Sequence, residues 1–159
     1  SLHDALPILQ GFVNLKVRQN QHLQRKLTPD FVIDWLYKKV QKQINKVNEI
    51  GKNFNYFTPF ESIFEKAEKA KQVISPGTQF GEGWLISGEI LSFASQGVNH
   101  VISLQPFGCI ANHIVEKGIE KRIKSLCPQM NILSLDFDSS VSDVNITNRL
   151  LLFIDNINN

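Results

Sequence analysis

Cys109 has the clearest chemical potential of any residue in this sequence. It ends the segment QPFGC at residues 105–109, directly after a short apolar run, and Asp136 and Asp138 end a second such run. Parallel α/β sheets bind ligands beyond the carboxyl ends of their strands, so we expect the thiol and both carboxylates at one sheet edge. The helix expected after Cys109 would direct free N–H groups and its positive dipole end toward the sulfur, which favours thiolate.

Three interpretations of Cys109 follow from its chemistry. Cysteine is often a small buried hydrophobe, and this is the default for a single thiol. It could instead be a nucleophile paired with His113, four residues further on and near one helical face. It could also ligate an iron–sulfur cluster or another soft metal, although one cysteine supplies only one of about four cluster ligands. Residue spacing alone does not choose among the three.

The elements that position Cys109 form a predicted βαβ unit. Residues 99–105 and 131–137 are short segments rich in Val, Ile and Leu, and a helical stretch separates them. Such crossovers join parallel strands that helices cover on both faces, so two strands require further strands beside them. Residues 9–17, which alternate like a half-buried strand, or chain upstream would supply them. The predicted apolar face of the connecting helix comprises Ile110, Ile114, Val115, Ile119, Ile123 and Leu126.

The amino-terminal half is predicted to be helical. One helix begins at Thr28-Pro29-Asp30 and ends at Gly51, with its lysines on the solvated face. A capping box at residues 58–61 (TPFE) starts a second helix, and a third runs from about residue 82 to 96, closed by Gly97. We therefore expect a mainly helical lead-in over residues 9–80 and a βαβ-type part of a larger α/β domain over residues 81–159.

The two ends of the chain need separate comment. Residues 1–8 (SLHDALPI) match a sequencing adapter translated as codons, so we expect this segment to be non-native and the chain to be a fragment. Near the other end, Ser140 and Asp143 are expected to cap a final helix. Its predicted buried stripe comprises Ile146, Leu150, Phe153 and Ile157.

Composition excludes several classes of protein. The chain has 159 residues, 42% hydrophobic and 20% charged, as expected for a globular domain with its own core. No apolar run reaches the ~20 residues of a membrane span. A net charge of +2 gives no argument for nucleic acid as a partner. Two cysteines without an export signal fit the reducing cytoplasm. The glycines of GEGWLISG lack both the strand and the spacing of a dinucleotide-binding loop.

Several motifs together resemble one known family. They are QPFGC-x-x-NH at residues 105–113, Lys117-Gly118, Pro128 with Asn131-Ile132, Asp136-x-Asp138, and Ser142-x-x-Asn145-x-x-Asn148-Arg149. Over residues 81–153 the chain resembles the carboxyl-terminal region of the 2-hydroxyacyl-CoA dehydratase superfamily. It is most similar there to the large activator-type proteins, the CoA-substrate-specific enzyme activases.

This resemblance implies a Rossmann-like parallel α/β domain with flanking helices, a 4Fe-4S cluster and low-potential electron transfer in anaerobic bacteria. Cys109 matches the family cysteine that ligates the cluster, and the other ligands would lie in upstream domains. Ala111 stands where the family usually has proline, and Cys127 matches no family cysteine, so we expect it to pack at a helix end. A fragment of this kind is not expected to be active alone, because its partners would be the upstream domains and dehydratase subunits.

Other matching residues would surround the cluster, although each also has a plain structural interpretation. His113 could tune the cluster through a hydrogen bond or lie at a surface or interface. Acidic strand ends are common, and Asn148 and Arg149 could hold the preceding loop. The alternative functions are a dehydratase or acyl-CoA reductase subunit and a structural or docking domain without a cluster. The candidate surrounding residues are Gln105, His113, Asp136, Asp138, Asn148 and Arg149.

Overall fold

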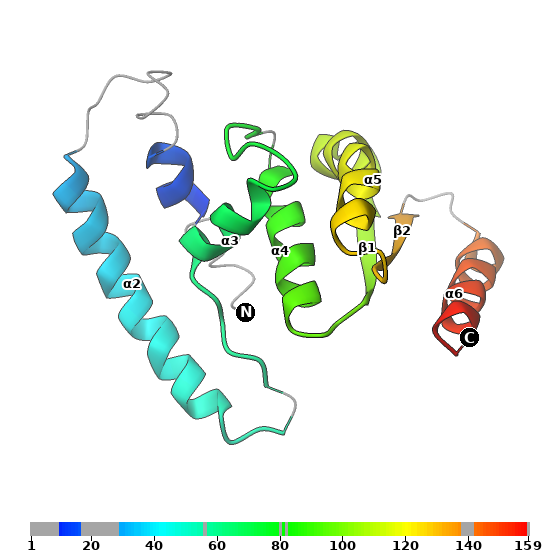
Figure 1. Cartoon of the computed structure of the whole chain (residues 1–159), viewed down its shortest axis with the longest axis horizontal. Helices are drawn as coiled ribbons and strands as arrows, with labels where there is room; N and C mark the ends of the chain where they lie inside the picture. Colours follow the sequence, from blue (N-terminus) through cyan, green and yellow to red (C-terminus); the bar gives the residue numbers. More distant parts are fainter. Residues whose placement is uncertain are drawn as a thin grey trace. The chain divides into compact units, whose positions relative to one another are not determined.

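The computed structural model describes residues 10–16, 29–55, 57–79, 81, 83–137 and 142–158. The chain forms two compact units, residues 1–68 and 69–159, which contain helices and a two-stranded parallel sheet (Figure 1). This mixed architecture is compatible with the predicted α/β class. After a short helix over residues 10–16, the elements are α2 (Asp30–Gly51), α3 (Ile63–Ala70), α4 (Gly83–Ser95), β1 (His100–Pro106), the π-helix η2 (Ala111–Glu116), α5 (Lys117–Leu126), β2 (Asn131–Phe137) and α6 (Asp143–Asn158).

The strand predicted over residues 9–17 is wrong, because residues 10–16 are helical. Gln10 and Val13 are buried, which is the three-residue spacing of a helix face, and Phe12 packs edge-on against Tyr37 of α2 at 5.9 Å. A short apolar alternation fits both periodicities, and tertiary packing decides between them. Among the described residues, β1 therefore has no strand from this region beside it.

Helix α2 begins and ends close to the predicted positions. It starts directly after Pro29, whereas Thr28 lies outside the described residues. Ile33 and Ile44 are buried, and Lys38, Lys39, Lys42 and Lys46 are exposed, which confirms the solvated lysine face. Gly51 is the last residue of the helix, and its missing side chain makes room for the ring of Phe57, because a Cβ there would lie 2.4 Å from that ring.

The capping box predicted at residues 58–61 is displaced. Helix α3 starts at Ile63, and the reciprocal contacts belong to Ser62 and Glu65. The Ser62 hydroxyl accepts from the Phe64 N–H at 3.3 Å, and the Glu65 carboxylate accepts from the Ser62 N–H at 3.2 Å. Ser62 also contacts the Tyr37 hydroxyl at 2.8 Å. This contact with α2 favours the later of two overlapping capping-box patterns, since Ser62-x-x-Glu65 has the same signature as residues 58–61.

In the second unit, α4 confirms the predicted third helix. Gly97 has φ 81°, and its N–H donates to Ala94 while the Val98 N–H donates to Phe93, so a Schellman motif closes the helix. At the other end, Gly83 allows α4 to approach η2 closely. A Cβ there would lie 3.1 Å from Val115.

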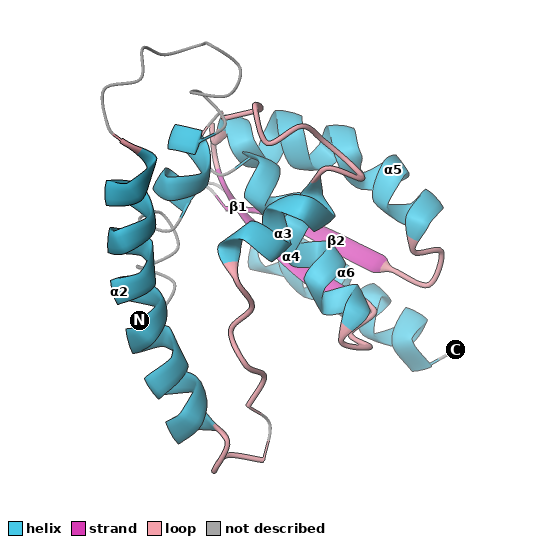
Figure 2. Cartoon of the chain, turned by 60° about the vertical axis from the view of Figure 1, so that its left-hand side comes forward, coloured by secondary structure: helices cyan, strands magenta, loops and turns pink. Residues whose placement is uncertain are grey.

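The predicted βαβ unit is confirmed. Strands β1 and β2 are parallel and lie side by side, with His100 opposite Asn131 and Leu104 opposite Leu135 (Figure 2). Helix α5 and η2 connect them. Beside the sheet, a hydrophobic cluster combines residues from α4, η2, α5 and the residue just before β2: Ile90, Val115, Ile119, Ile123 and Met130.

The predicted apolar face of the connecting helix is only partly correct. Val115, Ile119 and Ile123 are buried, but Ile110 and Ile114 are 54% and 66% exposed. Residues 111–116 form a π-helix, in which the Lys117 N–H reaches back to the Asn112 carbonyl. The wider turn shifts the buried face by one residue at its start, so Ala111 is buried instead of Ile110. A constant helical period could not anticipate this shift.

Helix α6 has more apolar surface than predicted. Phe153 is buried and its ring lies edge-on against His100 at 6.2 Å, whereas Ile157 of the predicted stripe is exposed. Ser140, the expected cap, lies outside the described residues. No helix in the described part of the chain is both long and apolar enough to cross a bilayer. The other exposed apolar residues of α6 are Val144, Leu151, Leu152 and Ile154.

Candidate functional site

The turn after β1 places Cys109 at the carboxyl end of the sheet, as predicted. Gly108 has φ 77°, and the Cys109 N–H donates to the Pro106 carbonyl at 3.1 Å. The Phe107 N–H donates to the Phe137 carbonyl at 3.0 Å, which ties the turn to the end of β2. Cys109 is half-buried. The thiol therefore belongs to a turn that is held by main-chain bonds to both strands.

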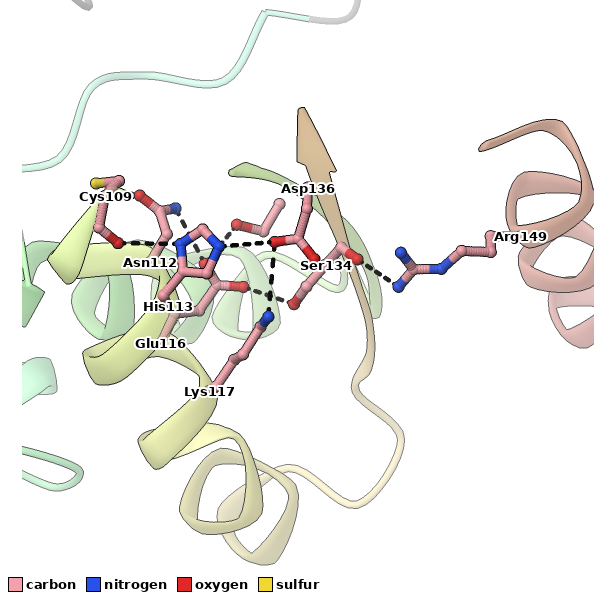
Figure 3. Close-up of polar contacts among 9 residues, drawn as sticks. Cys109, Asn112, His113, Glu116, Lys117, Ser134, Asp136 and Arg149 are labelled. Atoms are coloured by element: carbon pink, nitrogen blue, oxygen red, sulfur yellow. Dashed lines mark hydrogen bonds and ion pairs between the residues drawn. The ribbon is translucent and has the colours of Figure 1, made fainter. Parts of the chain in front are cut away.

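His113 connects this turn to β2 through both nitrogens of its ring. Nδ1 lies 3.2 Å from the Cys109 carbonyl oxygen, and Nε2 lies 3.3 Å from Oδ1 of Asp136. The Cys109 sulfur points away from His113 and Asp136 (Figure 3). A cysteine nucleophile needs its thiol within hydrogen-bond reach of a base. Since the imidazole contacts the carbonyl of Cys109 and not its sulfur, this geometry does not favour a Cys109–His113 nucleophile pair.

Asp136 completes the predicted grouping at the strand ends. Its Oδ1 lies between His113 Nε2 and Lys117 Nζ, which is 3.6 Å away. Neither contact is a hydrogen bond, and Oδ1 itself is buried without a hydrogen-bond partner among the described residues, so the interaction is electrostatic. The side chains of Asp136 and Lys117 are 39% and 44% exposed, and water screens such pairs. Asp138 lies outside the described residues.

Glu116 is the main feature that the sequence interpretation missed. This residue of η2 is only 2% exposed. Its carboxylate accepts from the Ser103 hydroxyl at 2.6 Å, the Ser134 hydroxyl at 2.9 Å and the Asn112 amide at 3.2 Å. Ser103 and Ser134 stand opposite each other in the β1–β2 register. One carboxylate thus joins both strands to the π-helix. The available signal was a serine at the centre of each apolar strand.

Gln105 lies on the same face of the sheet as this carboxylate. Side chains alternate along a strand, so Gln105 shares the side of Ser103, and it is opposite Asp136 in the register. The residue is fully buried, and neither its amide nitrogen nor its amide oxygen has a hydrogen-bond partner among the described residues. Unpaired buried amides are uncommon and destabilising. Gln105 is therefore a strained part of the core beside the Cys109 turn.

The two candidates on α6 have different positions. Arg149 donates from Nη2 to the Ser134 carbonyl oxygen at 2.6 Å, so it contacts the backbone of β2 and not Cys109 (Figure 3). Asn148 is exposed. The structure thus brings His113 and Asp136 together with the main chain of Cys109, and it assigns Arg149 to the strand edge.

The donor set within the described residues does not complete a metal site. No group of three or more His, Cys, Asp or Glu side chains could hold a metal ion in that part of the chain. Cys127 follows α5 before β2 begins, whereas Cys109 follows the end of β1, so about 20 Å of parallel strand separates the two thiols. Cys127 packs against the hydrophobic cluster, as predicted. The described residues therefore place one free thiol, that of Cys109, at the strand-end edge.

Comparisons of the chain with family models, curated proteins and solved structures give no match.

Proposed function

We propose that this chain is part of an iron–sulfur electron-transfer protein of the 2-hydroxyacyl-CoA dehydratase activator type, with Cys109 as one thiolate ligand. The observation that carries the proposal is the position of the thiol, which lies beyond the carboxyl end of β1 and points away from His113 (Figure 3). A bound cluster would supply one-electron transfer at low potential. The remaining ligands would come from other polypeptide segments.

The proposal assigns positioning roles to the polar residues around the turn. His113 contacts the Cys109 carbonyl, and the buried Glu116 joins the π-helix to both strands. These contacts fix the main chain that carries the thiol without occupying the sulfur. The parallel β1–β2 pair and its crossover helix support a Rossmann-like domain as the surrounding fold. Two free cysteines are consistent with a reducing, cytoplasmic location.

The ligand assignment is tested on the protein in its cellular form, purified without oxygen. Iron, acid-labile sulfide and visible absorbance are compared among the wild type, Cys109→Ala and Cys127→Ala. We expect Cys109→Ala to lose most of the iron and Cys127→Ala to keep it, because only Cys109 lies at the strand-end edge. Equal iron in the wild type and Cys109→Ala contradicts the assignment.

A structural or docking domain without a cluster is the second candidate function. The exposed apolar residues of β1 and α6 favour it, since such surfaces usually mark contacts with other polypeptides. The same purification separates the two candidates. A cellular form without iron, which stays bound to its partner when Cys109 is replaced by alanine, supports the docking domain.

A further inference from the structure

The outer edge of β1 can be defined from two main-chain hydrogen bonds. The Asn131 N–H donates to the Asn99 carbonyl at 2.7 Å, and the Phe107 N–H donates to the Phe137 carbonyl at 3.0 Å. Successive residues of a paired strand direct their N–H and C=O groups to opposite sides. Residues 99 and 107 face β2, so the odd-numbered residues between them also face β2. The even-numbered residues of β1 therefore face outward.

The outward groups of β1 belong to His100, Ile102 and Leu104. Among the described residues, β1 has no strand on this side. The side chains of Ile102 and Leu104 are 43% and 61% exposed. Native edge strands are usually protected by charged residues, by proline or by a bulge. Pro106 ends this edge, but none of the three outward residues named above is a lysine or carries a carboxylate. Within the part of the chain that the structure describes, the β1 edge is therefore unpaired and carries no protecting charge.

The outer edge of β2 is protected in two ways. By the same alternation, its outward residues are Ile132, Ser134 and Asp136. The Ser134 carbonyl already accepts from Arg149 at 2.6 Å. Asp136 adds a charged side chain on this strand, which is unfavourable beside a further strand. Of the two sheet edges, β1 therefore offers the better surface for strand addition.

We propose that the outer edge of β1 pairs antiparallel with the same edge of a second copy of this chain. A two-fold axis at Ile102 places this residue opposite its own copy and His100 opposite Leu104 of the second copy. All outward N–H and C=O groups from residue 100 to 104 then gain partners, and no like charges meet. Because the β2 edge is protected, the pairing closes at two copies and does not propagate. This proposal does not depend on Cys109.

The mass of the chain in solution tests the proposal. Light scattering after size exclusion should give twice the monomer mass of 18.1 kDa at about 100 μM, within the range of a modest interface. Leu104→Lys should raise the dimer dissociation constant by roughly tenfold or more, because it brings a lysine to each side of the pairing. Leu151→Lys is the matched control, since Leu151 of α6 is 59% exposed and lies outside β1. It should leave the mass unchanged.

Residue-resolved hydrogen exchange of the wild type tests the register without any substitution. The amides of Ile102 and Leu104 should become protected as the concentration rises, whereas the amide of Ser103 faces β2 and should be protected throughout. A wild-type monomer at about 100 μM overturns the proposal. A Leu104→Lys variant whose dimer dissociation constant equals that of the wild type also overturns it. Amides at 102 and 104 that exchange at one rate at all concentrations would also overturn it.

Discussion

The two faces of the β1–β2 sheet differ in the polar groups that they bury and the apolar groups that they expose. The face toward η2 carries Ser103, Ser134 and the fully buried Gln105, with the Glu116 carboxylate bonded at its centre. The opposite face carries the exposed apolar residues Ile102 and Leu104. A buried polar face requires paired hydrogen bonds, and an exposed apolar face requires a covering surface. The first requirement is met at the Glu116 carboxylate but not at the unpaired Gln105 amide, and the second indicates contact with another polypeptide.

The largest expected effect comes from removing the charge at the centre of the polar face. Glu116→Ala leaves two hydroxyls and an amide without their acceptor, so we expect the free energy of unfolding to fall by about 3 kcal/mol. Urea unfolding followed by the fluorescence of Trp84 measures this in a Trp35→Phe background. Glu116→Gln, which keeps an acceptor oxygen, is the matched control and should cost less. A loss below that of Glu116→Gln would show that the carboxylate does not hold the strands.

The next largest effect concerns the one well-buried residue of the apolar face. Leu135 is 2% exposed, so Leu135→Ala should lower the free energy of unfolding by about 2.5 kcal/mol through lost burial and a cavity. Leu104→Ala is the control on the same face, and its higher exposure predicts a much smaller loss. Both are measured with the same urea titration. Similar losses for the two would mean that the apolar face is covered evenly within one chain.

A substitution of Gln105 is expected to increase the stability of the protein, in contrast to the two substitutions above. Replacing its unpaired amide by an apolar side chain of similar length, Gln105→Met, should raise the free energy of unfolding by about 1 kcal/mol. Ser103→Ala, which removes a hydroxyl bonded to Glu116, should lower it and serves as the contrast. Destabilisation by Gln105→Met would show that the amide has a partner in solution.

The smallest expected effect is at the rim of the polar face. Asp136→Asn removes a partly exposed ion pair with Lys117 and the carboxylate contact of His113 Nε2, and we expect it to change the free energy of unfolding by about 0.5 kcal/mol or less. Any change should shrink further when the titration is repeated in high salt. A loss of stability as large as that of Glu116→Ala would show that Asp136 stabilises the sheet as much as the bonds of Glu116 to Ser103 and Ser134 do.

The sequence predicted those parts of the fold in which periodicity and terminal signals agree. The parallel βαβ unit, α4 with Gly97, and the placement of Cys109 and Asp136 at one edge of the sheet followed from apolar runs and the strand-end rule. The helix over residues 10–16 could not be predicted in this way, and local sequence alone did not choose between the capping-box patterns at residues 58–61 and 62–65. Both depend on contacts with Tyr37 in a different helix.

The candidate site was predicted in position but not in its internal bonding. The sequence placed His113 near Cys109, yet the side-chain contact joins a ring nitrogen to a carbonyl oxygen. Glu116 was missed because its serine partners are 13 and 18 residues away and reach it only through the strand register. A search for central serines on neighbouring strands, with a carboxylate in the crossover helix, would have found it.

The contacts of His113 and Glu116 depend on the number of residues in the π-helix at residues 111–116. Each residue of a regular helix advances by about 100°, so deleting one residue from this turn would rotate everything before it relative to α5. His113 would leave Asp136, or Glu116 would leave the serines, because regular spacing cannot hold both alignments. A single-residue insertion or deletion here would therefore disturb several contacts of the polar face at once. Point mutations, by contrast, alter its contacts one at a time.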